Sequence, residues 1–187
     1  MSLGISDIKK GSLITMGGEP YLVMALAHQH IGRGSANAQL KAKSLVTGKI
    51  IDRTLKPSDE VEEAEISRMD SEFIYNKGDE YWFHEAGNPG NRFAIDGEVI
   101  GGQGAFLKAK MPVRAVKFQE RVINVELPIK ADYEVTEAPP NVRGNTAQGG
   151  SKQVTIETGA KINTPMFVET GDKIRINTET GEYVERA

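Results

Sequence analysis

The sequence predicts an all-β protein built from three small β-barrels. Three observations support this fold class: short apolar segments that alternate with polar residues, glycine-containing turns between them, and no long amphipathic helical pattern. The chain has 187 residues, of which 39% are hydrophobic, and this length suits one to three small domains. Because each expected barrel is near the lower size limit for independent folding, we expect the barrels to pack against one another.

The predicted modules are an N-terminal domain over residues 1–65, a central domain over 66–128 and a C-terminal domain over 129–187. The boundaries are suggested by Pro57 with the acidic stretch that follows it, and by Pro128, because proline does not continue a central strand. The predicted strands are Ser12–Met16, Tyr21–Leu26, Gln39–Val46, Lys49–Leu55, Glu72–Tyr75, Glu80–His84, Val113–Phe118, Val122–Leu127, Ala131–Thr136, Gln153–Glu157, Met166–Glu169 and Asp172–Asn177.

Two segments interrupt the strand pattern. Gly87–Gly104 is rich in glycine and is expected to form a long loop, followed by one helical turn over Ala105–Lys110. Glu137–Lys152 contains two prolines and three glycines and is expected to form a second loop.

The composition excludes several classes of protein. With no cysteine, the chain has neither a disulfide scaffold nor a thiolate metal site. The N-terminal residues lack an apolar signal segment, and the longest apolar run, Tyr21–Ala27, is far too short to span a bilayer. We therefore expect a cytoplasmic protein with no membrane partner.

Charge is unevenly distributed along the chain. Residues 1–56 contain 8 Lys+Arg against 3 Asp+Glu, whereas residues 57–140 contain 9 against 17. On the predicted strand Gln39–Val46, Lys41 and Lys43 share the polar face. A basic head attracts phosphate, so these two lysines are candidate RNA contacts.

Catalytic signatures are almost absent. The chain contains no nucleophile elbow, zinc-protease motif, P-loop or dinucleotide-binding motif. His28 and His30 would share a face of one strand, but without a third ligand we expect no metal site and no cofactor. The tripeptide Gly101-Gly102-Gln103 resembles the one that positions water in peptide-release factors, so a hydrolase is one alternative.

The sharpest local feature is Gly32-Arg33-Gly34 in the predicted turn. Flanking glycines permit positive φ and keep bulky neighbours away from the arginine. A long, permanently charged side chain would therefore project from the tip of a hairpin.

The chain resembles bacterial elongation factor P, the counterpart of the eukaryotic factor that carries hypusine, nearly from end to end. The residues that carry the resemblance are Gly18–Tyr21, Gly32–Ala36, Leu45–Gly48, Tyr75–Tyr81, Val125–Pro128, Gly144–Gly150, Glu157–Ala160 and Thr180–Val184.

This resemblance implies an elongated, tRNA-like shape, with an N-terminal KOW-like (SH3-like) barrel followed by two OB-fold barrels. It implies a translation factor and not an enzyme. Such factors bind both ribosomal subunits between the peptidyl and exit tRNA sites and relieve stalling at consecutive prolines. The tip residue, here Arg33, would reach toward the CCA end of the peptidyl-tRNA and would be the candidate modification site. The factor would act as a monomer, together with a modifying enzyme.

Further sites follow from the resemblance. The tip loop consists of Ile31, Gly32, Gly34, Ser35 and Ala36 around the tip residue. The loop expected at the exit-site codon consists of Gly144, Asn145 and Thr146, and the candidate tRNA contacts near the C-terminus are Tyr183 and Arg186.

The sequence departs from the family pattern at three positions. Ile31 replaces the usual proline before the tip glycine, and Asn145 replaces the usual aspartate. The usual tip residue is an extended lysine, and a subset of the family has arginine that carries rhamnose. Arg33 fits this subset, whereas Gly34 after it is typical of the lysine type.

Two further alternatives stay open from the sequence. One is a paralogue of the same superfamily. The other is a general OB-type nucleic-acid binder, for which Tyr81 and Trp82 are the adjacent exposed-aromatic candidates.

Overall fold

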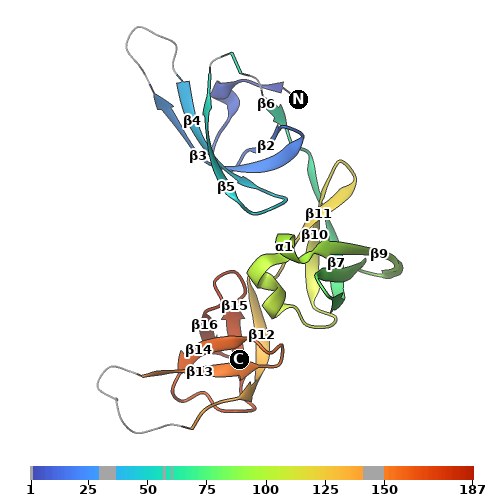
Figure 1. Ribbon diagram of the computed structural model, residues 1–187, viewed down its shortest axis with the longest axis vertical. Coiled ribbons are helices and arrows are strands. Elements are labelled where there is room, and N and C mark those ends of the chain that lie inside the picture. The colour runs from blue at the N-terminus through green and yellow to red at the C-terminus, as the bar shows by residue number, and fades with distance from the viewer. Residues whose placement is uncertain (1, 30–36, 57, 60, 141–149) are drawn as a thin grey trace.

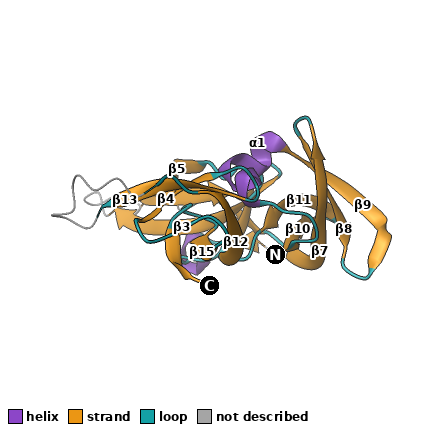
Figure 2. Cartoon of the chain, turned by 90° about the horizontal axis from the view of Figure 1, so that it is seen from below, coloured by secondary structure: helices purple, strands orange, loops and turns teal. Residues whose placement is uncertain are grey.

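The computed structural model describes residues 2–29, 37–56, 58–59, 61–140 and 150–187, except for the side chains of His28 and Gln29. These residues form three antiparallel sheets. The sheets follow one another along a bent, elongated molecule, with the N-terminal sheet at one end and the C-terminal sheet at the other (Figure 1). Almost all of the described chain is strand or loop, and helix occurs only in short segments (Figure 2). The predicted all-β fold class is confirmed.

The N-terminal sheet has the strand order β1-β6-β2-β3-β4-β5. The acidic stretch after Pro57, which the sequence suggests as a boundary, contains β6. This strand pairs with both β1 and β2. Val61 of β6 is buried in the same core as Ile5 and Ile14. The elements of this sheet are β1 (Ser2–Leu3), the short 3-10 helix η1 (Ile5–Asp7), β2 (Leu13–Met16), β3 (Glu19–Gln29), β4 (Asn37–Ser44), β5 (Ile50–Leu55) and β6 (Val61–Glu63).

The central sheet has the order β11-β10-β7-β8-β9, and β11 also approaches β9. A short helical segment lies between the third and fourth strands of this unit. The five-stranded barrel is of the OB type. The elements are β7 (Ile66–Lys77), β8 (Glu80–Glu85), β9 (Asn88–Asp96), α1 (Gly97–Ile100), the 3-10 helix η2 (Gly101–Phe106), β10 (Pro112–Phe118) and β11 (Arg121–Glu126).

The prediction of a long loop over Gly87–Gly104 was wrong. Asn88–Asp96 is strand β9, which pairs with β8 and turns Ile95 into the core. The Asp96 carboxylate then accepts a hydrogen bond from the Glu98 N–H and caps α1. The glycines at 87 and 90 obscured the alternation at the start of this strand, because glycine has no side chain that marks a face. The helical turn expected over Ala105–Lys110 begins earlier, and η2 ends at Phe106.

The C-terminal sheet repeats the central order, as β14-β13-β12-β15-β16. The predicted strand Met166–Glu169 was wrong, because a tight turn at Gly159, with φ of 86°, brings the chain back at once. The returning strand buries Ile162 and Thr164 at alternate positions, and residues 166–167 form a turn. The strands are β12 (Lys130–Glu137), β13 (Ser151–Ile156), β14 (Lys161–Pro165), β15 (Lys173–Asn177) and β16 (Tyr183–Arg186).

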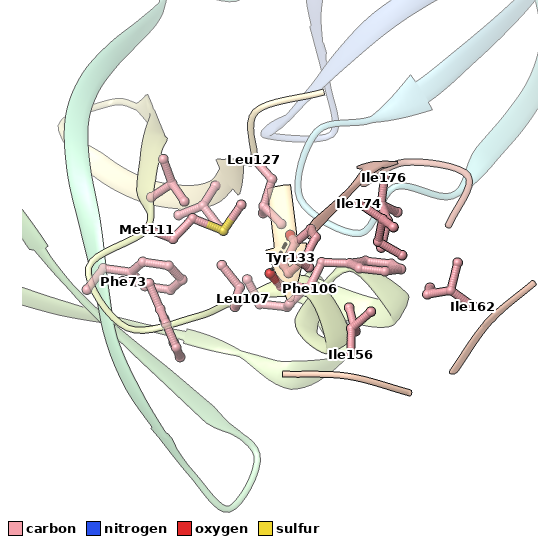
Figure 3. Packing of buried hydrophobic residues seen from close by; sticks show 14 of the residues in the cluster. Phe73, Phe106, Leu107, Met111, Leu127, Tyr133, Ile156, Ile162, Ile174 and Ile176 are labelled. Carbon is pink, nitrogen blue, oxygen red and sulfur yellow. Dashed lines mark hydrogen bonds between the residues drawn. The ribbon is translucent and has the colours of Figure 1, made fainter. Parts of the chain in front are cut away.

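Two separate hydrophobic cores hold the described chain together. One lies inside the N-terminal sheet. The other is continuous across the central and C-terminal sheets, where Phe106 and Leu107 of the central unit lie beside Tyr133 and Ile174 (Figure 3). The central and C-terminal barrels are therefore one packed body.

Polar contacts reinforce this junction. The Tyr133 hydroxyl donates to the Phe106 carbonyl at 2.7 Å. The Lys108 ammonium donates to the Asp132 carbonyl at 2.8 Å and to the Glu157 carboxylate at 2.9 Å, and lies 5.1 Å from the centre of the Tyr133 ring. Between the N-terminal and central sheets, the Asn124 side chain donates to the Leu45 carbonyl at 3.1 Å.

Candidate nucleic-acid interface

The two longest strands of the N-terminal sheet carry the predicted tip. β3 and β4 pair up to Gln29 and Asn37. At ~3.4 Å per residue, the 11 residues of β3 extend about 35 Å. The ladder therefore presents the connection between the strands at its far end. The tip residues Ile31, Gly32, Arg33, Gly34, Ser35 and Ala36 lie outside the described residues.

Lys41 and Lys43 occupy the exposed face of β4. The alternate residues Ala38, Leu40 and Ala42 are buried, so the predicted division between the two faces of this strand is confirmed. In the sheet register, Lys41 lies opposite Asp52 of β5. The two ammonium groups lie on the strand that leads away from the tip, and they are accessible to an anionic partner.

The exposed face of β4 continues into a cleft between the N-terminal and central units. The cleft has a volume of about 1100 Å³. Its basic groups include Lys43, Lys49 and Arg114, and Asn124 lies between the two walls. Acidic side chains outnumber them in the same lining, namely Asp70, Glu72, Glu98, Glu126 and Glu179.

At the C-terminal end, Gly144, Asn145 and Thr146 lie outside the described residues. The strands that lead to and from them pair at two positions, Val135 with Ile156 and Glu137 with Thr155. The Lys152 ammonium donates to the Pro139 carbonyl at 3.2 Å, and the Ala138 N–H donates to the Thr170 hydroxyl at 3.0 Å. These contacts anchor the described flanks of the loop.

Tyr183 and Arg186 lie on β16. Tyr183 is half-buried, packs on the shared core and borders a surface groove. The Arg186 guanidinium forms an ion pair with Asp172, while its side chain stays 57% exposed. An RNA contact made by Arg186 would therefore share this guanidinium with Asp172.

Arg175 braces the same strand pair. Its guanidinium donates to both oxygens of Asp132, at 2.7 and 3.1 Å, and to Glu185 at 2.7 Å. The hydrogen bond from Arg175 lowers the pKa of Asp132 below its ordinary value, so this carboxylate stays charged.

Two glycines in and beside the Gly101-Gly102-Gln103 segment, at positions 101 and 104, have structural roles. Gly101 has a φ of 57° where α1 passes into η2. Gly104, one residue further on, faces the Tyr81 ring so closely that an added Cβ would lie 2.5 Å from the tyrosine oxygen. The packing of η2 against β8 therefore explains why residue 104 is a glycine.

The aromatic candidates for nucleic-acid binding need one correction. Tyr81 points into the barrel, where its ring lies 6.2 Å from that of Phe73. The exposed neighbour of Trp82 is Tyr75, on the adjacent strand. A backbone bulge between Phe73 and Tyr75 shifts the register, and the sequence pattern did not reveal this bulge.

Metal binding and membrane insertion are two further possibilities for the described part of the chain. No group of three or more His, Asp or Glu side chains there could hold a metal ion. The predicted His28 and His30 pair lies outside that part, because the side chain of one and the whole of the other are not described. None of the described helices is long and apolar enough to cross a membrane.

The comparisons with known proteins decide the family. A sequence model described as "Elongation factor P (EF-P) KOW-like domain" matches residues 4–61, and one described as "Elongation factor P, C-terminal" matches residues 131–186. A protein named elongation factor P from Persephonella marina is 39% identical over 186 residues, which cover 100% of this chain and 97% of that protein. The chain belongs to the elongation factor P family. The protein of the same name from Moorella thermoacetica is 35% identical, with 99% and 100% covered.

Solved structures agree on the fold. The eukaryotic translation initiation factor 5A from Methanococcus jannaschii superposes with a TM-score of 0.50 at 17% identity, and covers 67% of this chain and 93% of its own. Members of the elongation factor P family are translation factors and not enzymes, so this chain acts in protein synthesis with the ribosome.

Some structurally important residues were not predicted as site residues. Lys108 and Tyr133 bind the two OB-type barrels together, and Asn124 links the first barrel to the second. Tyr133 lies in a clear alternating strand, which predicts its burial but not the carbonyl that its hydroxyl reaches. The sequence carries no signal for Asn124, because its partner is a backbone carbonyl 79 residues away.

Proposed function

We propose that this elongation factor binds the ribosome between the peptidyl and exit tRNA sites and promotes peptide-bond formation at consecutive prolines. The observation that carries the proposal is the full-length relation to elongation factor P, combined with a long, paired β3–β4 ladder that ends at the tip segment. The factor works in the cytoplasm, where ribosomes translate, and acts as a monomer.

The proposed mechanism is positioning. Proline is a poor nucleophile and a stiff peptidyl donor, so reactants at consecutive prolines are poorly aligned. Arg33 at the tip contacts the CCA end of the peptidyl-tRNA and holds it in a geometry suited to attack. Such alignment lowers the barrier by up to several kcal/mol without acid–base chemistry by the factor.

The remaining candidate contacts provide affinity. Lys41 and Lys43 face outward on β4 and meet RNA phosphates near the tip. Tyr183 and Arg186 contact tRNA near the C-terminus, and the loop with Gly144, Asn145 and Thr146 faces the exit-site codon. Tyr183, Arg186 and the flanks of this loop belong to the packed body of the two OB-type barrels, whereas Lys41 and Lys43 belong to the N-terminal barrel with its own core.

Modification of the tip belongs to the same proposal. A modifying enzyme attaches rhamnose to Arg33 and so extends its reach toward the tRNA. Intact-mass measurement of the natively expressed protein tests this step, because an attached sugar adds a defined mass and an unmodified chain overturns the assignment.

Arg33→Ala tests the central step. We expect the variant to lose the stimulation of a reconstituted translation system on a proline-run message, and to sediment with ribosomes nearly as the wild type does, because affinity is distributed over many phosphate contacts. The paired variant Lys41→Ala/Lys43→Ala gives the opposite pattern, with weaker binding and a smaller salt dependence. Wild-type rescue by Arg33→Ala refutes the role of the tip, and equal stimulation of proline-free messages refutes the specificity.

A further inference from the structure

The central barrel presents an aromatic pair on its outer surface. The rings of Tyr75 and Trp82 stack across β7 and β8 with centroids 6.4 Å apart and an interplanar angle of 22°. Tyr75 is 43% exposed, and the exposed Ala94 lies opposite Trp82 on β9. Three neighbouring strands therefore contribute one apolar row to the surface.

This row lies at a characteristic position in the fold. β7, β8 and β9 are the first three strands of the OB-type barrel, and the face over the second and third strands is where such barrels usually bind ligands. Phe83, next to Trp82, is fully buried, so Trp82 lies on the outer side. Trp82 is half-buried and its indole nitrogen is covered, so Tyr75 is the more accessible ring of the pair.

The electrostatics of this face disfavour RNA. Residues 72–98, which form this face, contain 6 Asp+Glu and 2 Lys+Arg. Residues 108–126, on the other side of the barrel, contain 2 Asp+Glu and 5 Lys+Arg. In the row beside the aromatic pair, Glu80 lies between Asp96 and Lys77. In the row on its other side, His84 lies between Glu72 and Arg92, and the Glu72 carboxylate is 3.7 Å from the His84 imidazole. Each row therefore contains a cation as well as a carboxylate, and the excess of carboxylates comes from the whole segment. A phosphate backbone meets net repulsion here, and a cationic group meets attraction.

The corresponding face of the C-terminal barrel provides a contrast. Its second and third strands, β13 and β14, place Gln153 opposite Asn163 and Thr155 opposite Lys161. Three of these side chains are neutral hydrogen-bonding groups and the fourth is a cation, with no aromatic ring among them. The aromatic and acidic character is therefore specific to the central barrel and does not follow from the fold.

We propose that the Tyr75–Trp82 face binds an arginine- or lysine-bearing segment of a partner protein. A guanidinium of the partner segment stacks on the exposed aromatic surface, and the carboxylates of Glu72 and Glu80 pair with other cationic side chains of that segment. The proposed function provides the setting for such a partner, since proteins that lie against ribosomal RNA need cationic segments. The chemistry of the face itself stands independently of that setting.

Trp82 provides a direct test, because it is the single tryptophan of the chain. The probe is a 12-residue peptide in which arginine alternates with glycine and serine. We expect a saturable change in Trp82 emission, a weaker one with the lysine analogue of the peptide, and none with its glutamate analogue or with a ten-nucleotide single-stranded uridine RNA.

Matched variants assign the site. Tyr75→Phe keeps the ring and should bind as the wild type does, while Tyr75→Leu removes the ring and should weaken binding ~2–5-fold. Glu80→Gln should weaken binding ~2-fold, and Glu120→Gln, which removes the same charge from the β10–β11 turn, should not. The proposal is overturned if the arginine peptide leaves the emission unchanged, if the RNA changes it at similar concentrations, or if Tyr75→Leu binds as Tyr75→Phe does.

A second experiment uses the ribosome. A photoreactive phenylalanine analogue at position 75 should crosslink to protein, as judged by protease sensitivity and nuclease resistance of the product. A crosslink to RNA, or none in a factor that sediments with ribosomes, refutes the proposed partner and leaves the proposed function intact. If the factor does not sediment, the proposed function fails, and the peptide titration still decides the chemistry of the face.

Discussion

Replacing Tyr133 with phenylalanine removes one hydroxyl from the junction of the two OB-type barrels. The side chain is 1% exposed, and its hydroxyl donates to the Phe106 carbonyl at 2.7 Å. Burial raises the pKa of this hydroxyl, so it stays a donor throughout the accessible pH range. The ring keeps its contacts with the shared core in the variant, and what changes is the loss of a donor to a buried carbonyl.

The magnitude follows from that loss. A buried acceptor that loses its donor costs ~1–3 kcal/mol, and for a chain of this size each kcal/mol lowers the melting temperature by ~2–4 °C. We expect Tyr133→Phe to melt about 2–12 °C below the wild type in a thermal scan followed by circular dichroism. Tyr75→Phe is the control, because its hydroxyl is on the surface, and it should melt within about 1 °C of the wild type. If Tyr133→Phe melts at the same temperature as the control, the hydrogen bond from Tyr133 to Phe106 does not stabilise the fold, and only the Lys108 contacts remain as polar support for the junction.

Two further predictions concern the same part of the molecule. Burial alone would raise the pKa of Glu157, but hydrogen bonds from Lys108 and from the Glu134 N–H together hold it below its ordinary value. These hydrogen bonds stabilise the fold fully above the ordinary glutamate pKa, and the stabilisation is lost as the pH falls through the lowered pKa of Glu157. Between pH 7 and pH 3, the urea midpoint of the wild type should therefore fall more steeply than that of Glu157→Gln. Parallel curves for the two proteins would contradict the assignment. Gly104→Ala places a Cβ 2.5 Å from the Tyr81 oxygen. The substitution should lower the free energy of unfolding by ~1–3 kcal/mol, as measured by urea unfolding. An unchanged urea midpoint would mean that Tyr81 moves aside without cost.

The sequence predicted the fold where polar and apolar residues alternate cleanly. β4 is the best case, because Leu40 and Ala42 face the core while Lys41 and Lys43 face outward. The pattern failed where the physical cause is nonlocal or backbone-based. β9 begins with Asn-Pro-Gly, which has no facial pattern, and pairing with β8 makes it a strand. β14 follows a turn so tight that the pattern misplaced the strand by several residues.

The sequence predicts those parts of the candidate site that depend on neighbouring residues, and it misses those that depend on contacts between distant segments. The glycine-flanked Arg33 and the basic strand beside it are visible in the sequence. The contacts of Lys108 join residues 24 and 49 positions apart, so they exist only after the barrels have packed. The bulge in β7 places Tyr75 beside Trp82 on the surface, because one extra residue reverses the faces of a strand. Tyr81 faces inward because consecutive residues of β8 alternate between the two faces.

The division into two cores has a consequence for how the chain matures during its own synthesis. The first barrel has all of its parts once Val61 and Glu62 can pair with the opening strand, so it can close while later residues are still being added. The central barrel remains incomplete at the corresponding stage, because its core is continuous with Tyr133, Val154 and Ile176 of the C-terminal barrel. A chain cut short after residue 128 would therefore display Phe106 and Leu107 to solvent, where quality-control proteases and chaperones find their substrates.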